Sequence, residues 1–260
     1  MPSLFLLSTG RTATTWIAAV FEHAGARAVH EPEPRWLRLV GNAHAAGAVS
    51  RERAVLAVRK TRAEVVAAPG GPYVEANSLI SGLAGPLLDA FDDTRVVQIV
   101  RDPVSYVRSA IAWGQYRTAG RVLNVVPYRR LAAPQFRPWS VPERLRWARQ
   151  DQFERLCWTW TAQNRAMRTQ GAGNSRFRTV RFEDLIDEVR GLELLGELCS
   201  DLGLTADIGA VVRAAAIAKN ESAPRGAKVD LDSVQLRRLW GVCGGEAAHY
   251  GYAPDESALS

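Results

Sequence analysis

The stretch from Phe5 to Phe21, FLLSTGRTATTWIAAVF, holds residue types that could bind a phosphate. An apolar run ends in Ser-Thr-Gly, Arg11, Thr14 and Thr15 follow, and an amphipathic helix pattern comes next. Strand, loop and helix in that order are typical of a phosphate-binding loop, where backbone N–H groups at the helix N-terminus hold the anion. The lysine and the second glycine of the motif G-x-x-x-x-G-K-[ST] are absent. The sequence therefore predicts a phosphate loop of an unusual kind.

A second stretch, VVQIVRDPVSYVRSAI, combines an arginine with hydroxyl groups. We expect a strand to end at Arg101, and the Asp-Pro pair after it to open a helix. Ser105 and Ser109 share one face of that helix at 3.6 residues per turn. A guanidinium with a nearby hydroxyl suits a phosphate monoester, because both donate hydrogen bonds to its oxygens. The alternative is that Arg101 pairs with Asp102 or a surface carboxylate, and that Ser109 is only a helical residue.

Taken together, these stretches resemble the sulfotransferases that use 3′-phosphoadenylyl sulfate (PAPS). STGRTATTW is similar to the 5′-phosphosulfate loop of that family, and RDPVSYVRS to its 3′-phosphate segment, an arginine followed eight positions later by serine. RTVRFEDLI is similar to a strand that ends in aromatic-Glu-Asp-Leu, and NESAPRGAKV to a late loop. The resemblance spans most of the chain, with its pieces in the family's order, but it leaves the acceptor side unassigned.

The resemblance implies PAPS as co-substrate, adenosine 3′,5′-bisphosphate (PAP) as product, and no metal. It implies adenine stacking on Trp16 and Phe182, although ordinary core packing is the alternative for both. A helix N-cap without a ligand is the alternative for the loop. Glycine is usual in the family where this chain has Ala13, so Ala13 would be strained if the position needs a positive φ. The expected donor-binding residues are Arg11, Thr12, Ala13, Thr14, Thr15, Trp16, Arg101, Ser109, Phe182 and Arg225.

Sulfuryl transfer to a hydroxyl requires a general base. The resembling families use either a histidine or a glutamate just after the second strand, and AVHEPEP stands at that second place. The order of preference is Glu31, then His30, then Glu33. Two alternatives stay open: Glu31 pairs with a lid arginine, or His30 is the base and Glu31 orients it. In EANS, Ala76 stands where some carbohydrate sulfotransferases have a lysine, so Arg11 would stabilise the leaving phosphate alone.

Strand and helix signals alternate, which predicts an α/β fold: one domain over residues 1–260, with a parallel sheet flanked by helices, as in P-loop nucleotide-binding proteins. Prolines at 127, 134, 138 and 142 rule out a long helix, so we expect an irregular lid over residues 114–142, with a disordered insert as the alternative. The predicted strands are Leu4–Ser8, Ala28–Glu31, Tyr73–Ala76, Arg95–Val100 and Phe177–Phe182. The predicted helices are Thr14–Ala24, Arg51–Ala67, Leu79–Phe91, Val104–Trp113, Glu143–Thr169, Leu192–Leu202, Ile208–Lys219 and Ser233–Ala247.

Composition narrows the class of protein. The net charge of +6 comes almost wholly from arginine, without a basic run or a nucleic-acid-binding motif, so we expect no nucleic-acid partner. Three scattered cysteines and a short N-terminal apolar run predict a cytoplasmic protein without a membrane span. The expected partner is a small-molecule or carbohydrate acceptor with a hydroxyl or amine. A P-loop kinase and a non-catalytic nucleotide- or RNA-binding protein are the alternatives, and a homodimer stays open.

Overall fold

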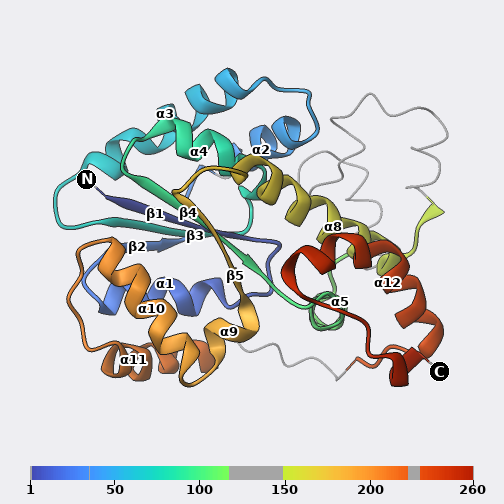
Figure 1. Cartoon of the computed structure of the whole chain (residues 1–260). Helices are drawn as coiled ribbons and strands as arrows, with labels where there is room; N and C mark the ends of the chain where they lie inside the picture. Colours follow the sequence, from blue (N-terminus) through green and yellow to red (C-terminus); the bar gives the residue numbers. More distant parts are fainter. Residues whose placement is uncertain (1, 35, 117–148, 222–228, 260) are drawn as a thin grey trace.

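A parallel five-stranded sheet forms the centre of the protein (Figure 1). The computed structural model describes residues 2–34, 36–116, 149–221 and 229–259. The strand order is β2-β3-β1-β4-β5, so the first strand lies in the middle of the sheet. This confirms the predicted α/β class with a parallel sheet flanked by helices. The strands are β1 Ser3–Ser8, β2 Arg27–His30, β3 Tyr73–Asn77, β4 Thr94–Val100 and β5 Phe177–Arg181.

The central strand is buried along its whole length. All six residues of β1 are buried, and the strand pairs with β3 from Ser3 opposite Tyr73 and with β4 from Ser3 opposite Thr94. A strand with both faces covered needs a continuous apolar run rather than alternation, which is what FLL supplies. The carboxyl ends of β1, β2, β3 and β4 therefore meet at one edge of the sheet.

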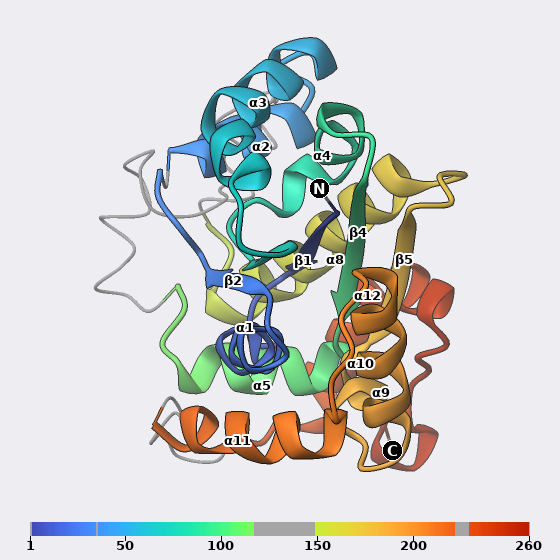
Figure 2. The ribbon, with the colours of Figure 1, turned by 90° about the vertical axis from the view of Figure 1, so that its left-hand side faces the viewer.

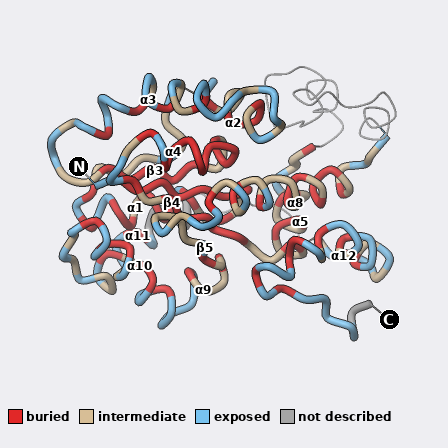
Figure 3. The backbone as a smooth tube through the Cα atoms, turned by 45° about the horizontal axis from the view of Figure 1, so that its top comes forward, coloured by how far each residue is buried: buried red, intermediate tan, exposed pale blue. Residues whose placement is uncertain are grey.

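Helices cover both faces of the sheet. Helices α1, α10 and α11 pack on one face, and α2, α3, α4 and α8 lie on the other (Figure 2). A third apolar cluster joins α5, α8 and α12, and buried positions in Figure 3 concentrate on the strands and on the inward sides of the helices. The helices are α1 Thr14–His23, α2 Leu37–Ala45, α3 Arg51–Ala67, α4 Ala84–Ala90, α5 Pro103–Ala112, α8 Gln152–Gly171, α9 Phe182–Ile186, α10 Arg190–Asp201, α11 Ile208–Glu221 and α12 Ser233–Ala247, with 3₁₀ turns at Ser81–Leu83, Ala248–Tyr250 and Glu256–Leu259.

The helix expected over Glu143–Thr169 is wrong in its continuity. Asp151 is extended, with φ −75° and ψ −179°, and its side chain accepts a hydrogen bond from the Glu154 N–H while Glu154 bonds back to the Asp151 N–H. This capping box begins a new helix at Gln152. The first part of the expected helix, residues 143–148, lies outside the described residues, as does most of the expected lid, residues 117–142.

Three further differences lie next to the site. Phe182 begins α9 instead of ending β5, and the expected helix from Leu79 becomes a 3₁₀ turn followed by α4. Helix α2 was not predicted from the sequence. It packs so closely on the turn after β3 that a Cβ atom on Gly82 would lie 2.1 Å from the Gly41 carbonyl oxygen, so glycine is required there.

Candidate functional site

A cavity of about 640 Å³ opens at the carboxyl edge of the sheet, against the N-terminus of α1. Ligand sites in open α/β sheets occur at this edge. The cavity draws its lining from the loop after β1, from the start of α1, from the ends of β2, β3 and β4, and from α2, α5, α8 and α9. The lining residues are Thr9, Gly10, Arg11, Ala13, Thr14, Thr15, Trp16, His30, Glu31, Arg38, Ser78, Leu79, Arg101, Ser109, Trp113, Gln115, Tyr116, Thr159, Gln163 and Phe182.

The loop between β1 and α1 has the backbone of an anion-binding loop. Gly10, Arg11 and Ala13 have φ of 85°, 61° and 52°. Ser8 Oγ holds the loop by accepting hydrogen bonds from the Gly10 N–H at 3.1 Å and from Thr12 Oγ1 at 2.8 Å. Left-handed residues next to right-handed ones turn successive N–H groups toward one point, which suits an anion.

Ala13 is the N-cap of α1, and its methyl side chain cannot accept a hydrogen bond from the first turn. The N–H groups of that turn are therefore left for a ligand or solvent. Ala13 does adopt a positive φ, and this left-handed conformation costs a residue with a Cβ atom about 1–2 kcal/mol that glycine would avoid. Thr14 and Thr15 line the cavity, whereas the Thr12 side chain is fully buried against Ser8 and does not.

Arg11 joins the loop to α5. Its Nε donates to Ser109 Oγ at 3.1 Å, and its guanidinium carbon lies 4.7 Å from the centre of the Trp113 ring. Arg101 donates from Nη1 to the Arg11 carbonyl oxygen at 2.6 Å. The two residues expected to read the 3′-phosphate therefore both contact Arg11, which is expected at the 5′-phosphosulfate.

Arg101 lies over the ring of Phe182, with its guanidinium carbon 4.8 Å from the ring centre. Its Nε is buried and has no hydrogen-bond partner within the described part of the chain. Burial lowers the pKa of the Arg101 guanidinium, although the charges of Glu183 and Asp102 oppose the shift. The Asp102 carboxylate does not hydrogen-bond Arg101; it caps α5 by accepting from the Ser105 N–H at 2.7 Å.

Glu183 supports the start of α5. Its carboxylate accepts from the Asp102 N–H at 3.0 Å and from the Tyr252 hydroxyl at 2.5 Å. The aromatic-Glu-Asp segment therefore fixes the backbone beside Arg101. Trp16 and Phe182 are 6% and 8% exposed and both line the cavity, so each combines core packing with a wall of the site.

The three candidate bases have different surroundings. Glu31 accepts from Ser78 Oγ at 2.5 Å, and its backbone is left-handed with φ 44°. His30 Nε2 lies 2.9 Å from Thr14 Oγ1, so His30 and Glu31 contact separate partners. Glu33 is exposed and does not line the cavity. Among the described lining residues, Glu31 supplies the sole carboxylate, and Arg11, Arg38 and Arg101 line the same cavity.

Several lining residues escaped prediction from the sequence. Ser78 follows β3 at the sheet edge, and the order of neighbouring strands would have placed it beside Glu31. Thr9 directly follows β1, and its buried hydroxyl has no hydrogen-bond partner within the described residues. Arg38 and Gln163 come from helices, with no local signal in the sequence. Arg225 lies outside the described residues.

No protein-family profile and no curated protein matches the chain. Solved structures show similarity at low identity. The crystal structure of a sulfotransferase from Alicyclobacillus acidocaldarius is 14% identical, with a TM-score of 0.48 over 95% of this chain and 93% of that one. The sulfotransferase domain from the curacin biosynthetic pathway is 14% identical, with a TM-score of 0.47 over 80% and 76%. The sulfotransferase domain from the Synechococcus PCC 7002 olefin synthase is 15% identical, with a TM-score of 0.45 over 98% and 96%. Similarity at this level does not establish a function for this chain.

Within the described residues, no helix has the length and apolar character to cross a membrane. No group of three His, Cys, Asp or Glu side chains that could hold a metal ion occurs in the same ranges.

Proposed function

We propose that the protein transfers a sulfuryl group from PAPS to a hydroxyl group of a small-molecule or carbohydrate acceptor. The observation that carries the proposal is the composition of one cavity. The cavity is lined by a left-handed loop, a helix N-terminus without a side-chain cap, Arg11 and Arg101, and by a single carboxylate among the described residues, Glu31. Such a site favours a ligand with two anionic groups and keeps one group able to take a proton.

The donor fits the polar atoms that the site leaves available. The first-turn N–H groups of α1 and the hydroxyls of Thr14 and Thr15 would hold the 5′-phosphosulfate. The buried Thr9 hydroxyl and Arg101 Nε lack hydrogen-bond partners in the described structure, as expected for atoms that bind phosphate oxygens. Arg101 and Ser109 would hold the 3′-phosphate, which requires Arg11 to exchange its contact with Ser109 for the donor. Trp16 and Phe182 would flank the adenine.

Glu31 would act as the general base. The acceptor hydroxyl gives its proton to the Glu31 carboxylate while its oxygen bonds to sulfur. The bond between sulfur and the 5′-phosphate oxygen breaks, and PAP leaves with the electron pair. Arg11 stabilises the negative charge that develops on that oxygen. The hydrogen bond from Ser78 orients the carboxylate before the acceptor arrives.

Binding separates this proposal from a kinase. PAP without metal should raise the thermal midpoint, and ATP with magnesium should not. The opposite pattern would favour a P-loop kinase. RNA binding that weakens with salt and is indifferent to nucleotide would favour a nucleic-acid-binding protein.

Glu31→Gln tests the base. The substitution keeps the side chain's size but removes its basicity, so turnover should fall on the order of 10²–10⁴-fold while PAP affinity stays unchanged. Turnover is measured with ³⁵S-labelled PAPS and methyl glycosides, whose hydroxyls do not ionise near neutral pH. Full activity in Glu31→Gln, with loss in His30→Ala at unchanged affinity, would make His30 the base.

A further inference from the structure

A buried ion pair lies against the chain segment that follows Glu31. Arg62, on α3, is 1% exposed and Glu75, on β3, is fully buried. Arg62 Nε donates to Glu75 Oε2 at 2.6 Å and Nη2 to Oε1 at 3.1 Å. Tyr73 Oη and Asn77 Nδ2 donate to the same carboxylate at 2.7 and 2.8 Å. With four donors, the Glu75 carboxylate is fixed, and so is the guanidinium that it orients.

The outer side of the Arg62 guanidinium holds the chain that follows Glu31. Nη2 donates to the Pro32 carbonyl at 3.4 Å and Nη1 donates to the Glu33 carbonyl at 3.2 Å. Burial alone would lower the pKa of Arg62, but the hydrogen bonds and charge of Glu75 raise it, so the guanidinium stays charged. A single buried cation therefore connects the sheet to the loop that carries the proposed base.

Glu31 needs such support because its backbone conformation is unfavourable. Its φ of 44° is left-handed, which a residue with a Cβ adopts only where its surroundings enforce it. The Glu31 N–H donates to the Ala76 carbonyl at 3.2 Å, and Ser78 holds the carboxylate from the cavity side. Both of these contacts come from the segment Glu75–Ser78, which also contains the carboxylate that binds Arg62.

We propose that Arg62, oriented by Glu75, is a positioning residue that holds Glu31 in its left-handed, cavity-facing conformation. The proposal rests on the proposed function, in which Glu31 is the general base. Arg62 does not line the cavity, so it would touch neither donor nor acceptor. It acts on the backbone of Pro32 and Glu33, and through it on the direction of the Glu31 carboxylate.

The test is Arg62→Lys. A lysine keeps the charge that Glu75 requires, but its single ammonium cannot also reach both carbonyl groups. Turnover of ³⁵S-labelled PAPS with a methyl glycoside should fall about 10²-fold, because a misplaced catalytic group costs that much, while PAP affinity is unchanged. In a Glu31→Gln background the same substitution should cause little further loss, because the two residues act through one step.

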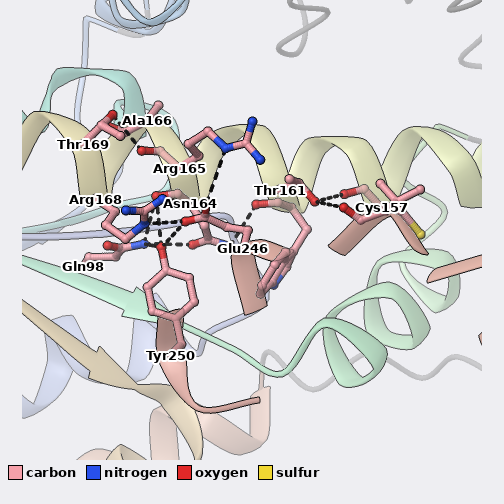
Figure 4. Close-up of polar contacts among 12 residues, drawn as sticks. Gln98, Cys157, Thr161, Asn164, Arg165, Ala166, Arg168, Thr169, Glu246 and Tyr250 are labelled. Carbon is pink, nitrogen blue, oxygen red and sulfur yellow. Dashed lines mark hydrogen bonds and ion pairs between the residues drawn. The ribbon is translucent and has the colours of Figure 1, made fainter. Parts of the chain in front are cut away.

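Arg168→Lys is the matched control. Arg168, on α8, also binds a buried glutamate with two nitrogens, at 2.8 and 2.9 Å. That glutamate is Glu246, on α12, so the pair joins two helices instead of a strand and a loop (Figure 4). Arg168→Lys should lower the free energy of unfolding without lowering turnover of the folded protein. Amide hydrogen exchange needs no acceptor: exchange at Glu31 should become roughly tenfold faster in Arg62→Lys and stay unchanged in Arg168→Lys.

Three results would overturn the inference: unchanged exchange at Glu31, an equal loss of turnover in both Glu31 backgrounds, or a loss of PAP affinity that explains the lower rate. Failure of the proposed function looks different. The wild-type protein would then transfer no sulfuryl group, or Glu31→Gln would keep full activity. Either result removes the catalytic role of Arg62. Amide hydrogen exchange at Glu31 would still decide whether Arg62 holds the loop.

Discussion

Arg101→Ala should weaken the binding of PAP far more than that of adenosine 5′-phosphate. The observed hydrogen bond to Arg11 and the proposed contact with the 3′-phosphate would give Arg101 two separable roles. It donates to the Arg11 carbonyl at 2.6 Å, which supports the loop for either nucleotide. A hydrogen bond from a charged guanidinium to a carbonyl is worth about 1.5–3 kcal/mol, so both ligands should lose up to roughly 10- to 150-fold in affinity. A charged contact to the 3′-phosphate adds about 1.5–3 kcal/mol, a further loss of roughly 10- to 150-fold for PAP alone.

Titration calorimetry of both nucleotides at one salt concentration measures the two losses. Arg178→Ala is the control, because Arg178, on β5, forms an exposed ion pair with Glu197, on α10, and does not line the cavity. It should leave both affinities unchanged. Equal losses for the two nucleotides in Arg101→Ala would refute the assignment of the 3′-phosphate to Arg101 and would leave it only the role of supporting Arg11.

Two further predictions concern stability. Ala13→Gly should raise the free energy of unfolding in urea by about 0.5–1 kcal/mol, because relief of the left-handed strain exceeds the entropy that glycine adds to the unfolded chain; a lower stability would show that the packing of the Ala13 methyl group outweighs its strain. Burial would raise the pKa of Glu246, but hydrogen bonds from Arg168 and Tyr250 lower it below the ordinary value of 4.5. The ionised Glu246 therefore stabilises the fold above pH 4.5, and this stabilisation is lost as the pH falls through the lowered pKa of the folded state. Glu246→Gln should therefore cost about 1.5–3 kcal/mol at pH 7 and progressively less in urea titrations below pH 4.5, whereas a pH-independent difference would contradict the shift.

The sequence predicts elements well where local signals and packing agree. Helices α3 and α12 have the predicted bounds, because Ser50 caps one and the Asp232–Gln235 capping box begins the other. Asp151 and Glu154 carry the same capping-box signal, which interrupts the helix predicted from Glu143 and begins α8 at Gln152. Helix α2 has no side-chain cap and contains Gly41, so packing on the turn after β3 forms it, and a single sequence does not reveal such packing.

The candidate site follows the same division. Four of the predicted residues line one cavity, because each follows a strand or lies on a helix that begins at the sheet edge: Arg11, Arg101, Ser109 and Glu31. What surrounds Glu31 depends on long-range pairing of β2 with β3 and on a buried ion pair 13 positions apart in the chain. Ser78 lies in the segment EANS, which indicates nothing about a contact with Glu31, and Arg62 stands in no motif, so their places emerge only from the three-dimensional arrangement.

The central place of β1 has a consequence for the chain during its synthesis. Ser3 meets Thr94 across 91 positions, and both neighbours of β1 are made long after it. At about 5–20 residues per second, the segment FLLS waits on the order of 5–20 s for its second partner strand. During that time an apolar, β-prone segment of the nascent chain is unpaired. We expect it to be bound by a ribosome-associated chaperone, and refolding from denaturant to be slow and to aggregate at high protein concentration.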